Sequence, residues 1–377
     1  MFPRSISSSS SRRSTRNATE PLRHIDPWLV MATAALSLIG IITVYSATRG
    51  AIPPYNNNFL FRQIIFVFLG SGVLTLFAIV DYRKLHDWAW FFYGATTVLL
   101  VLVLVMGAEV NGARSWFSLG FIQIQPAEFS KLSLIGALAF LLSDFRGDVD
   151  GRRLLTCLAV AAIPMAIIMG QPDLGTNLVL GVITLAMVVV GGAKAKHLAI
   201  LGIVAVIAVV GVLNSSALAE YQRNRLTAFV DPTTQSAYNI NRSQEAIANG
   251  GITGTGLFDG PQTNLDWVPE QQTDFIFTAA AEQFGFLGSA IVLGLYALLC
   301  YRIWRTAQLA RDWFGTLICV GVLAMFVFSI FQNVGMAMGI MPITGIPLHL
   351  MSYGGSSTVT ALAAIGLVLN VHARRFL

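Results

Sequence analysis

Ionisable side chains inside or beside long apolar stretches are the first candidates for chemistry in this sequence. Glu128 and Lys131 are three residues apart in one apolar run, so on a helix they share a face. Asp274 stands where a long polar segment gives way to an apolar run, and Glu282 follows about two helical turns later. A charge inside a membrane span costs about 2.5–3.5 kcal/mol on insertion scales, so such groups usually face a protein interior or a wet cavity. Each of these groups is therefore either functional or paired.

Both interpretations stay open for most of these groups. Glu128 and Lys131 are either a neutralised structural pair or part of a binding site. Asp173 is either a carboxylate stabilised at a helix N-terminus by the macrodipole or part of the same site. Asp274 could also cap a helix, but it lies at the depth where a lipid headgroup would react. Glu282 is better explained as an internal hydrogen-bond partner.

Residues 341–357 form a third candidate region, rich in Gly and Pro. Pro342, Gly345 and Pro347 prevent a continuous helix. Non-helical backbone at membrane depth must be buried in protein or line a wet cavity. A Gly/Ser turn at a helix start can cradle an anion such as a pyrophosphate, and the alternative is a packed re-entrant connection. The donors are supplied by Ser352, Tyr353, Gly354, Gly355, Ser356 and Ser357.

The composition of the chain requires a membrane to position these groups. Of 377 residues, 55% are hydrophobic and 11% are charged, where a soluble protein carries about 25% charged residues. Mean hydropathy is +0.68. The sequence predicts an all-α integral membrane protein, a polytopic bundle of about ten transmembrane helices. The predicted spans are 27–47, 60–80, 88–106, 126–143, 154–170, 174–191, 197–217, 274–301, 313–337 and 356–373.

The distribution of charge sets the orientation and excludes other classes. Lys and Arg concentrate in the terminal tail and the even-numbered loops, which predicts that both termini face the cytoplasm. The net charge of +5 thus serves topology and anionic lipids, and no nucleic-acid partner is expected. The three cysteines are isolated in apolar runs, which argues against disulfides and zinc. Residues 1–25 are expected to be a disordered, basic, Ser/Arg-rich cytoplasmic tail preceding a membrane domain at 26–377.

A long acidic loop, 218–273, is expected outside the membrane between the seventh and eighth spans. Such a loop is usually functional or disordered. Residues 238–249 predict a short amphipathic helix whose apolar anchors would be Tyr238, Ala246 and Ile247. The glycines that follow predict a tight turn held close to another segment: Gly250, Gly251, Gly254 and Gly256.

The sequence resembles the SEDS family of peptidoglycan polymerases (RodA, FtsW and SpoVE) over about residues 27–373. The chain is most similar to RodA at Thr344-Gly345 and Pro269-Glu270. It departs at Arg242, His349 and Gln272, where the family usually has Gln, Pro and, in RodA, frequently His. The matching motifs are Asn111-Gly112-Ala113 with Trp116, Gln125-Pro126-Ala127-Glu128 with Lys131, Gln171-Pro172-Asp173-Leu174-Gly175-Thr176, Tyr238, Ala246-Ile247, Gly250-Gly251, Pro269-Glu270, Thr273-Asp274-Phe275-Ile276-Phe277, Asn333, Gly335-Met336, Pro342-Ile343-Thr344-Gly345-Ile346-Pro347 and Ser352-Tyr353-Gly354-Gly355-Ser356-Ser357.

This resemblance implies a glycosyltransferase that polymerises glycan strands for cell elongation and shape. The 4-hydroxyl of lipid II would attack the anomeric carbon of a growing glycan on undecaprenyl pyrophosphate, with inversion. Asp274 would be the catalytic carboxylate, acting as general base. The implied substrate-binding residues are Arg114, Trp116, Gln125, Glu128, Lys131, Asp173, Arg225, Tyr238, Thr344, Ser352, Tyr353, Gly354, Gly355, Ser356 and Ser357.

The resemblance also implies partners and a location. A divalent cation, Mg or Mn, would suit the pyrophosphate, although no metal motif is visible, and no organic cofactor is expected. The protein partner would be a class B penicillin-binding protein, a transpeptidase, in the bacterial cytoplasmic membrane, with an extracytoplasmic active site. The alternatives are a lipid II flippase, a septal FtsW-like polymerase and a non-catalytic scaffold. A flippase needs polar groups through the full membrane depth. Here the motif residues gather on the outer side, which favours chemistry.

Overall fold

The computed structural model describes residues 24–110, 113–120, 122–145, 149–203, 235–265 and 267–376. Eight helices in these ranges are long and apolar enough to cross a membrane, which confirms the predicted polytopic bundle. A shorter apolar helix, α6 (Leu174–Val190), packs against α4, α5 and α12. The eight long helices are α1 (Pro27–Thr48), α2 (Asn58–Ile79), α3 (Tyr82–Met106), α4 (Pro126–Asp144), α5 (Gly151–Met169), α11 (Ile276–Leu309), α12 (Trp313–Ala337) and α13 (Gly355–Ala373).

Nine of the ten predicted spans coincide with a described helix. The tail 1–25, the seventh span 197–217 and the first part of the loop 218–273 lie mostly outside the described residues. The largest differences are at α3, which begins at Tyr82, and at α11, which continues to Leu309. Both helices run past the apolar stretch into charged sequence, because backbone hydrogen bonding does not end where hydrophobicity does.

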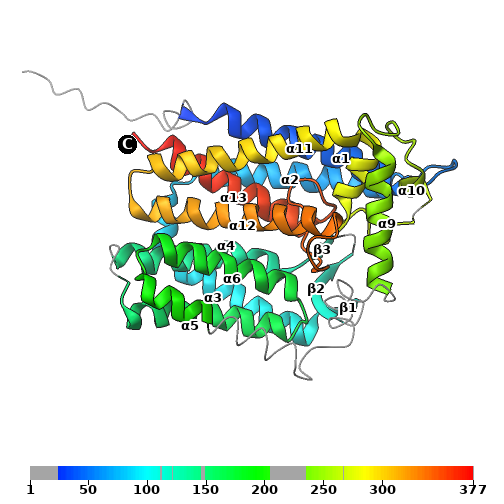
Figure 1. Ribbon diagram of the computed structural model, residues 1–377. Coiled ribbons are helices and arrows are strands. Elements are labelled where there is room, and N and C mark those ends of the chain that lie inside the picture. Colours follow the sequence, from blue (N-terminus) through cyan, green and yellow to red (C-terminus); the bar gives the residue numbers. More distant parts are fainter. Residues whose placement is uncertain are drawn as a thin grey trace, which may run out of the picture.

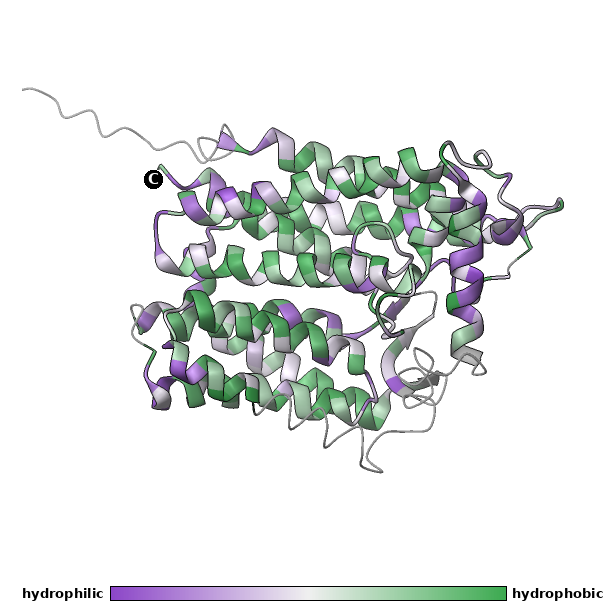
Figure 2. Ribbon diagram, viewed as in Figure 1, coloured by the Kyte–Doolittle hydropathy of each residue, from purple (hydrophilic) through white to green (hydrophobic). Residues whose placement is uncertain are grey.

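The long helices run side by side, and α9 (Gln235–Gly250) lies across one end of the bundle (Figure 1). The C-terminus and the start of α1 lie together at the opposite end. Hydrophobic residues fill the middle of the bundle, whereas polar residues collect at both ends and along α9 (Figure 2). This banding is the pattern expected of a protein that crosses a bilayer.

The centre of the bundle is α13, of which 94% of the apolar window is buried, whereas α2 and α3 are mostly exposed. Glycines let α2 and α13 approach closely. A Cβ added to Gly366 would lie 2.5 Å from the carbonyl oxygen of Leu74, and one added to Gly70 would lie 2.5 Å from the side chain of Leu362. Small residues serve this purpose between membrane helices, where packing replaces the hydrophobic driving force.

A three-stranded antiparallel sheet joins α3 to α4 and was not predicted from the sequence. Its strands are β1 (Ala108–Val110), β2 (Ala113–Leu119) and β3 (Ile122–Ile124), in the order β1-β2-β3. The sheet lies at the same end of the bundle as α9 (Figure 1).

At that end, α11 is broken at Gly285, where φ is 63°. The loop after α9 supplies hydrogen-bond partners for backbone groups at the break. Phe286 N–H donates to the carbonyl of Gly251 (2.9 Å), and Gly256 N–H donates to the carbonyl of Gln283 (3.2 Å). A Cβ on Gly254 would lie 2.1 Å from the same Gln283 oxygen. The prediction that these glycines hold a tight turn against another segment is confirmed.

The predicted amphipathic helix is also confirmed as α9, with one correction. Ala246 is fully buried and Ile247 packs against the core, but Tyr238 is 44% exposed and is not an apolar anchor. The ring of Tyr238 lies 5.1 Å from the guanidinium of Arg242, one turn along the same face. Ala237 and Ile240 are buried in its place.

Candidate active site

Asp274 lies immediately before α11, on a segment whose carbonyl groups are fixed by residues distant in the sequence. The carbonyl of Gln272 accepts a hydrogen bond from the N–H of Tyr353 (2.8 Å). The carbonyl of Thr273 accepts one from the hydroxyl of Ser352 (2.6 Å). The side chain of Asp274 is partly exposed. The backbone that carries this carboxylate is therefore held in one position.

Asn333, near the C-terminal end of α12, fixes the third carbonyl of this segment. Its Nδ2 donates to the carbonyl of Asp274 (2.8 Å) and also to that of Ile346 (2.9 Å). The adjacent Gln332 donates to the carbonyl of Pro342 (2.8 Å). Asn333 belongs to one of the motifs shared with the SEDS family, but its role could not be predicted from the sequence. An amide inside an apolar helix, where polar groups commonly join helices, was the available signal.

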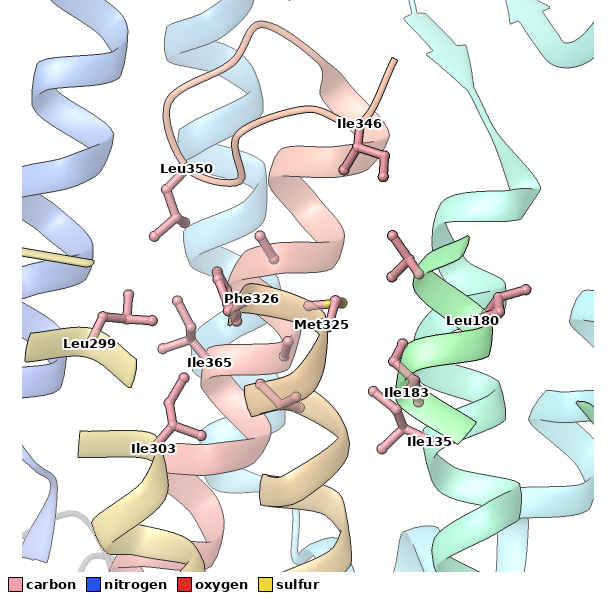
Figure 3. Packing of buried hydrophobic residues seen from close by; sticks show 14 of the residues in the cluster. Ile135, Leu180, Ile183, Leu299, Ile303, Met325, Phe326, Ile346, Leu350 and Ile365 are labelled. Atoms are coloured by element: carbon pink, nitrogen blue, oxygen red, sulfur yellow. The ribbon is translucent and has the colours of Figure 1, made fainter. Parts of the chain in front are cut away.

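Most of these contacts are made to the re-entrant segment, residues 338–354, which contains no helix or strand. Ile346 and Leu350 lie at the end of the apolar cluster that holds Phe326 and Ile365 (Figure 3). The re-entrant segment therefore packs against this core, and the anion-binding interpretation of the Gly/Ser turn that follows it stays a prediction.

Two glycines on neighbouring helices admit the backbone of the re-entrant segment. A Cβ on Gly175 of α6 would lie 2.6 Å from the carbonyl oxygen of Thr344. A Cβ on Gly40 of α1 would lie 2.6 Å from the Cα of Met351. The hydroxyl of Thr344 is buried and has no hydrogen-bond partner among the described residues.

The Gly/Ser turn that starts α13 is bound by neighbouring side and main chains. Ser356 accepts from the N–H of Gln125 (2.9 Å), and the ring of Tyr353 packs against Phe59 and Phe66. Gly355 lies against Phe66, because an added Cβ would be 2.9 Å from its ring. Gly354, Gly355 and Ser356 are partly exposed.

Gln125 and Asp173 join the starts of α4 and α6. Gln125 Nε2 donates to Asp173 Oδ2 (3.2 Å). Asp173 also accepts the N–H of Thr176 (2.9 Å) and its hydroxyl (2.8 Å), which makes it the N-cap of α6. With three donors on one carboxylate, the structural interpretation of Asp173 is the one this geometry favours.

Glu128 and Lys131 form a buried ion pair on α4, with Nζ 2.7 Å from Oε1 and 1–4% of each side chain exposed. The imidazole of His349 lies nearby, with Nδ1 3.0 Å from the hydroxyl of Ser357. The ring of His349 also packs edge-on against Phe326 of α12, with the ring centroids 5.6 Å apart.

The other predicted site residues are spread over the same end of the molecule. Arg114 and Trp116 lie on β2, and Tyr238 lies on α9. Arg225 lies outside the described residues. The structure thus gathers Asp274, Thr344 and the residues of 352–357 around the re-entrant segment, with Gln125 and Asp173 at its edge.

Comparison with known sequences places the chain among cell-wall proteins. The model of the FtsW/RodA/SpoVE cell cycle proteins matches residues 27–376. Stage V sporulation protein E of Bacillus subtilis is 37% identical over 92% of this chain and 96% of that protein. The peptidoglycan glycosyltransferase MrdB of Escherichia coli is 31% identical over 93% of this chain and 94% of that protein.

Solved structures give the same result. A chain from a peptidoglycan synthase complex, described as coordinating polymerization and crosslinking, superposes with a TM-score of 0.80 at 34% identity, covering 93% of this chain and 98% of that chain. Rod shape determining protein RodA of Thermus thermophilus superposes with a TM-score of 0.71 at 32% identity, covering 94% and 98%. Sequence motifs, helix order and overall structure therefore agree, and this chain belongs to the FtsW/RodA/SpoVE family.

Proposed function

We infer that this chain is a peptidoglycan glycosyltransferase that polymerises glycan strands. The relatives named MrdB, from Escherichia coli, and RodA, from Treponema pallidum, are both peptidoglycan glycosyltransferases, and each is matched over 93% of this chain. The placement of Asp274 is the observation that carries the proposal: a partly exposed carboxylate stands on a fixed backbone where the outer loop meets α11.

Asp274 is proposed to act as the general base. The 4-hydroxyl of lipid II attacks the anomeric carbon of the growing glycan, and its proton passes to the carboxylate of Asp274. The bond to the undecaprenyl pyrophosphate breaks with inversion at the carbon. A positioned base contributes about 10²–10⁴-fold to such a step. The pyrophosphate is a good leaving group, so no second carboxylic acid is needed.

The turn at the start of α13 is the proposed binding site for the pyrophosphate. Helix N-termini present N–H groups and a positive dipole end to anions. Gly354, Gly355 and Ser356 are partly exposed there, and the segment that carries Asp274 is hydrogen-bonded to Ser352 and Tyr353 just before them. Arg114 on β2 supplies a cation at the same end of the molecule.

The described residues do not build a dedicated metal site. Among them, no group of three or more His, Cys, Asp or Glu side chains could hold an ion. Asp173 already accepts three hydrogen bonds. The proposed reaction therefore includes no step on a Mg or Mn ion.

The membrane setting and partner follow from the same proposal. The active site would face the extracytoplasmic side, with both termini in the cytoplasm, because α9 lies at the end of the bundle opposite the C-terminus and the loop after α9 is hydrogen-bonded to the first turns of α11. A class B penicillin-binding protein is the proposed partner, since the similar synthase complex coordinates polymerization with crosslinking. The role proposed is cell elongation.

Purified protein with fluorescent lipid II in detergent tests the function directly. The wild type should produce glycan ladders, and Asp274→Ala and Asp274→Asn should lower their rate about 100-fold or more, because both remove the base. Asp259→Asn, on the same outer loop, is the control and should polymerise normally. Ladders from Asp274→Ala at the wild-type rate would refute the assignment of the base.

A further inference from the structure

Glu282 is a buried carboxylate on α11, about two turns beyond Asp274, that the proposed reaction does not use. Its side chain is fully buried, and a carboxylate in such a position requires donors. Oε1 accepts the N–H of Gln262 (2.8 Å). Oε2 accepts both the N–H (2.8 Å) and the hydroxyl (2.5 Å) of Thr263. Three donors from the outer loop thus converge on one side chain of a membrane helix.

The loop is shaped to reach this carboxylate. The two N–H donors belong to the short helix α10 (Pro261–Asn264), whose first N–H groups have no partner within the helix. A Cβ added to Gly260 would lie 2.6 Å from Oε2 of Glu282, so the chain approaches as closely as a glycine permits. The carboxylate therefore fixes the position of α10 against α11.

Thr263 also connects Glu282 to the segment that carries Asp274. Its hydroxyl oxygen accepts a hydrogen bond from Nε2 of Gln271 (3.1 Å), which is fully buried. Gln271 comes three residues before Asp274. The next three carbonyls, of residues 272–274, are the ones held by Tyr353, Ser352 and Asn333. Residues 272–274 are thus hydrogen-bonded to the re-entrant segment and α12. Gln271, just before them, is connected through Thr263 to Glu282.

We propose that Glu282, acting through Thr263 and Gln271, is a positioning residue for the carboxylate of Asp274. The proposal rests on the proposed function. Glu282 does not touch substrate; it sets where the segment before α11 begins, and so where the base stands relative to the attacking hydroxyl. A misplacement of about 1 Å can cost about 100-fold in rate. The two carboxylates then have separate tasks: Asp274, before α11, takes the proton, and Glu282, within α11, is held by three donors.

The test compares two threonines that both bond to residue 282. Thr263→Val removes the hydroxyl between Glu282 and Gln271, whereas Thr263→Ser keeps it. Thr255→Val is the matched control, because the Thr255 hydroxyl donates to the carbonyl of Glu282 (3.1 Å). We expect Thr263→Val to lower kcat about tenfold or more, with KM for lipid II unchanged. Thr263→Ser and Thr255→Val should retain the wild-type kcat.

Thermal unfolding in detergent accompanies each rate measurement. A drop in Tm for Thr263→Val with an unchanged kcat, an increase in KM alone, or an equal loss of kcat in Thr255→Val would overturn the proposal. If Thr263→Val does not fold, Gln271→Met, which keeps the volume and loses the bond, is measured in its place with the same expectation. Wild type and Asp274→Ala are run in parallel. No glycan from the wild type, or full activity of Asp274→Ala, would refute the proposed function instead.

Discussion

A single amide on α12 holds two carbonyl groups that are far apart in the sequence. Asn333 donates to Asp274 and to Ile346, while its own Oδ1 is buried without a partner among the described residues. An aspartate at position 333 has no N–H group to donate, so the carbonyls of Asp274 and Ile346 would both lose their donor. Leaving a buried polar group unsatisfied costs about 1–3 kcal/mol.

We therefore expect Asn333→Asp to destabilise the protein by about 1–3 kcal/mol and to lower polymerisation more than its stability loss explains. The measurements are thermal unfolding in detergent and the rate of glycan synthesis. Gln332→Leu is the control, because the Gln332 side chain donates to the carbonyl of Pro342 in the re-entrant segment rather than to the segment that carries Asp274. Equal losses of activity in the two variants would show that Asn333 does not act through Asp274.

The Glu128–Lys131 pair permits a second test at this scale. Removing one partner of a buried pair leaves an uncompensated charge and costs about 3–5 kcal/mol. Glu128→Gln and Lys131→Met should each destabilise the chain by about that amount, and the double variant by less than either. Additive losses of Tm in the double variant would show that the two side chains do not depend on one another.

At the scale of elements, the break in α11 is satisfied by the loop after α9. The carbonyls and N–H groups that the helix leaves open at Gly285 bond to the loop 250–256. Buried backbone N–H and carbonyl groups need hydrogen-bond partners, and the loop supplies them at this break.

Gly254→Ala should therefore disrupt the break, since its Cβ would lie 2.1 Å from the carbonyl oxygen of Gln283. Gly251→Ala is the matched control, because Gly251 also has positive φ but has open space around its Cβ position. Positive φ is strained for Ala in both variants, by about 1–2 kcal/mol. The loss of Tm in Gly254→Ala beyond that in Gly251→Ala therefore measures the steric contact with Gln283. Equal losses in the two variants would contradict the close approach of the loop to α11.

The helices were more predictable than the segments between them. Long apolar runs and capping residues such as Asp312 give α12 the bounds predicted from the sequence. The sheet β1-β2-β3 was missed because two of its strands are only three residues long and show no usable alternation. Tyr238 was misassigned because a helical pattern does not reveal which neighbouring positions face the bundle: Ala237 and Ile240 are buried, whereas the ring of Tyr238 lies beside Arg242 and is 44% exposed.

For the molecule as a whole, orientation is the property to test. Leu257 lies in the loop after α9 and Leu309 at the C-terminal end of α11, and both are at least 40% exposed. A membrane-impermeant maleimide should label Leu257→Cys in intact cells. It should label Leu309→Cys only after permeabilisation. The native cysteines are buried or partly buried, so the unmodified chain is the control. The reverse pattern would invert the topology and move Asp274 to the cytoplasm.

The sequence was enough to predict which residues of the candidate site could do chemistry, but not which hydrogen bonds join them. Asp274 and the Gly/Ser turn were found as residues with chemical potential beside apolar runs. The segments that carry them are held together by hydrogen bonds between residues far apart in the chain, such as Ser352 with Thr273 and Asn333 with Asp274. No local periodicity encodes such pairs, so the roles of Asn333, Thr263 and Gln271 required the structure.

The three tethered carbonyls before α11 have an entropic consequence. With the main chain at 272–274 held in place, the carboxylate of Asp274 can move mainly by rotation about χ1 and χ2. Ordering a residue's backbone costs about 1–2 kcal/mol, and here that cost is met during folding. Each catalytic cycle would then have to select only a side-chain rotamer, and repeated additions to one strand would all begin from the same geometry.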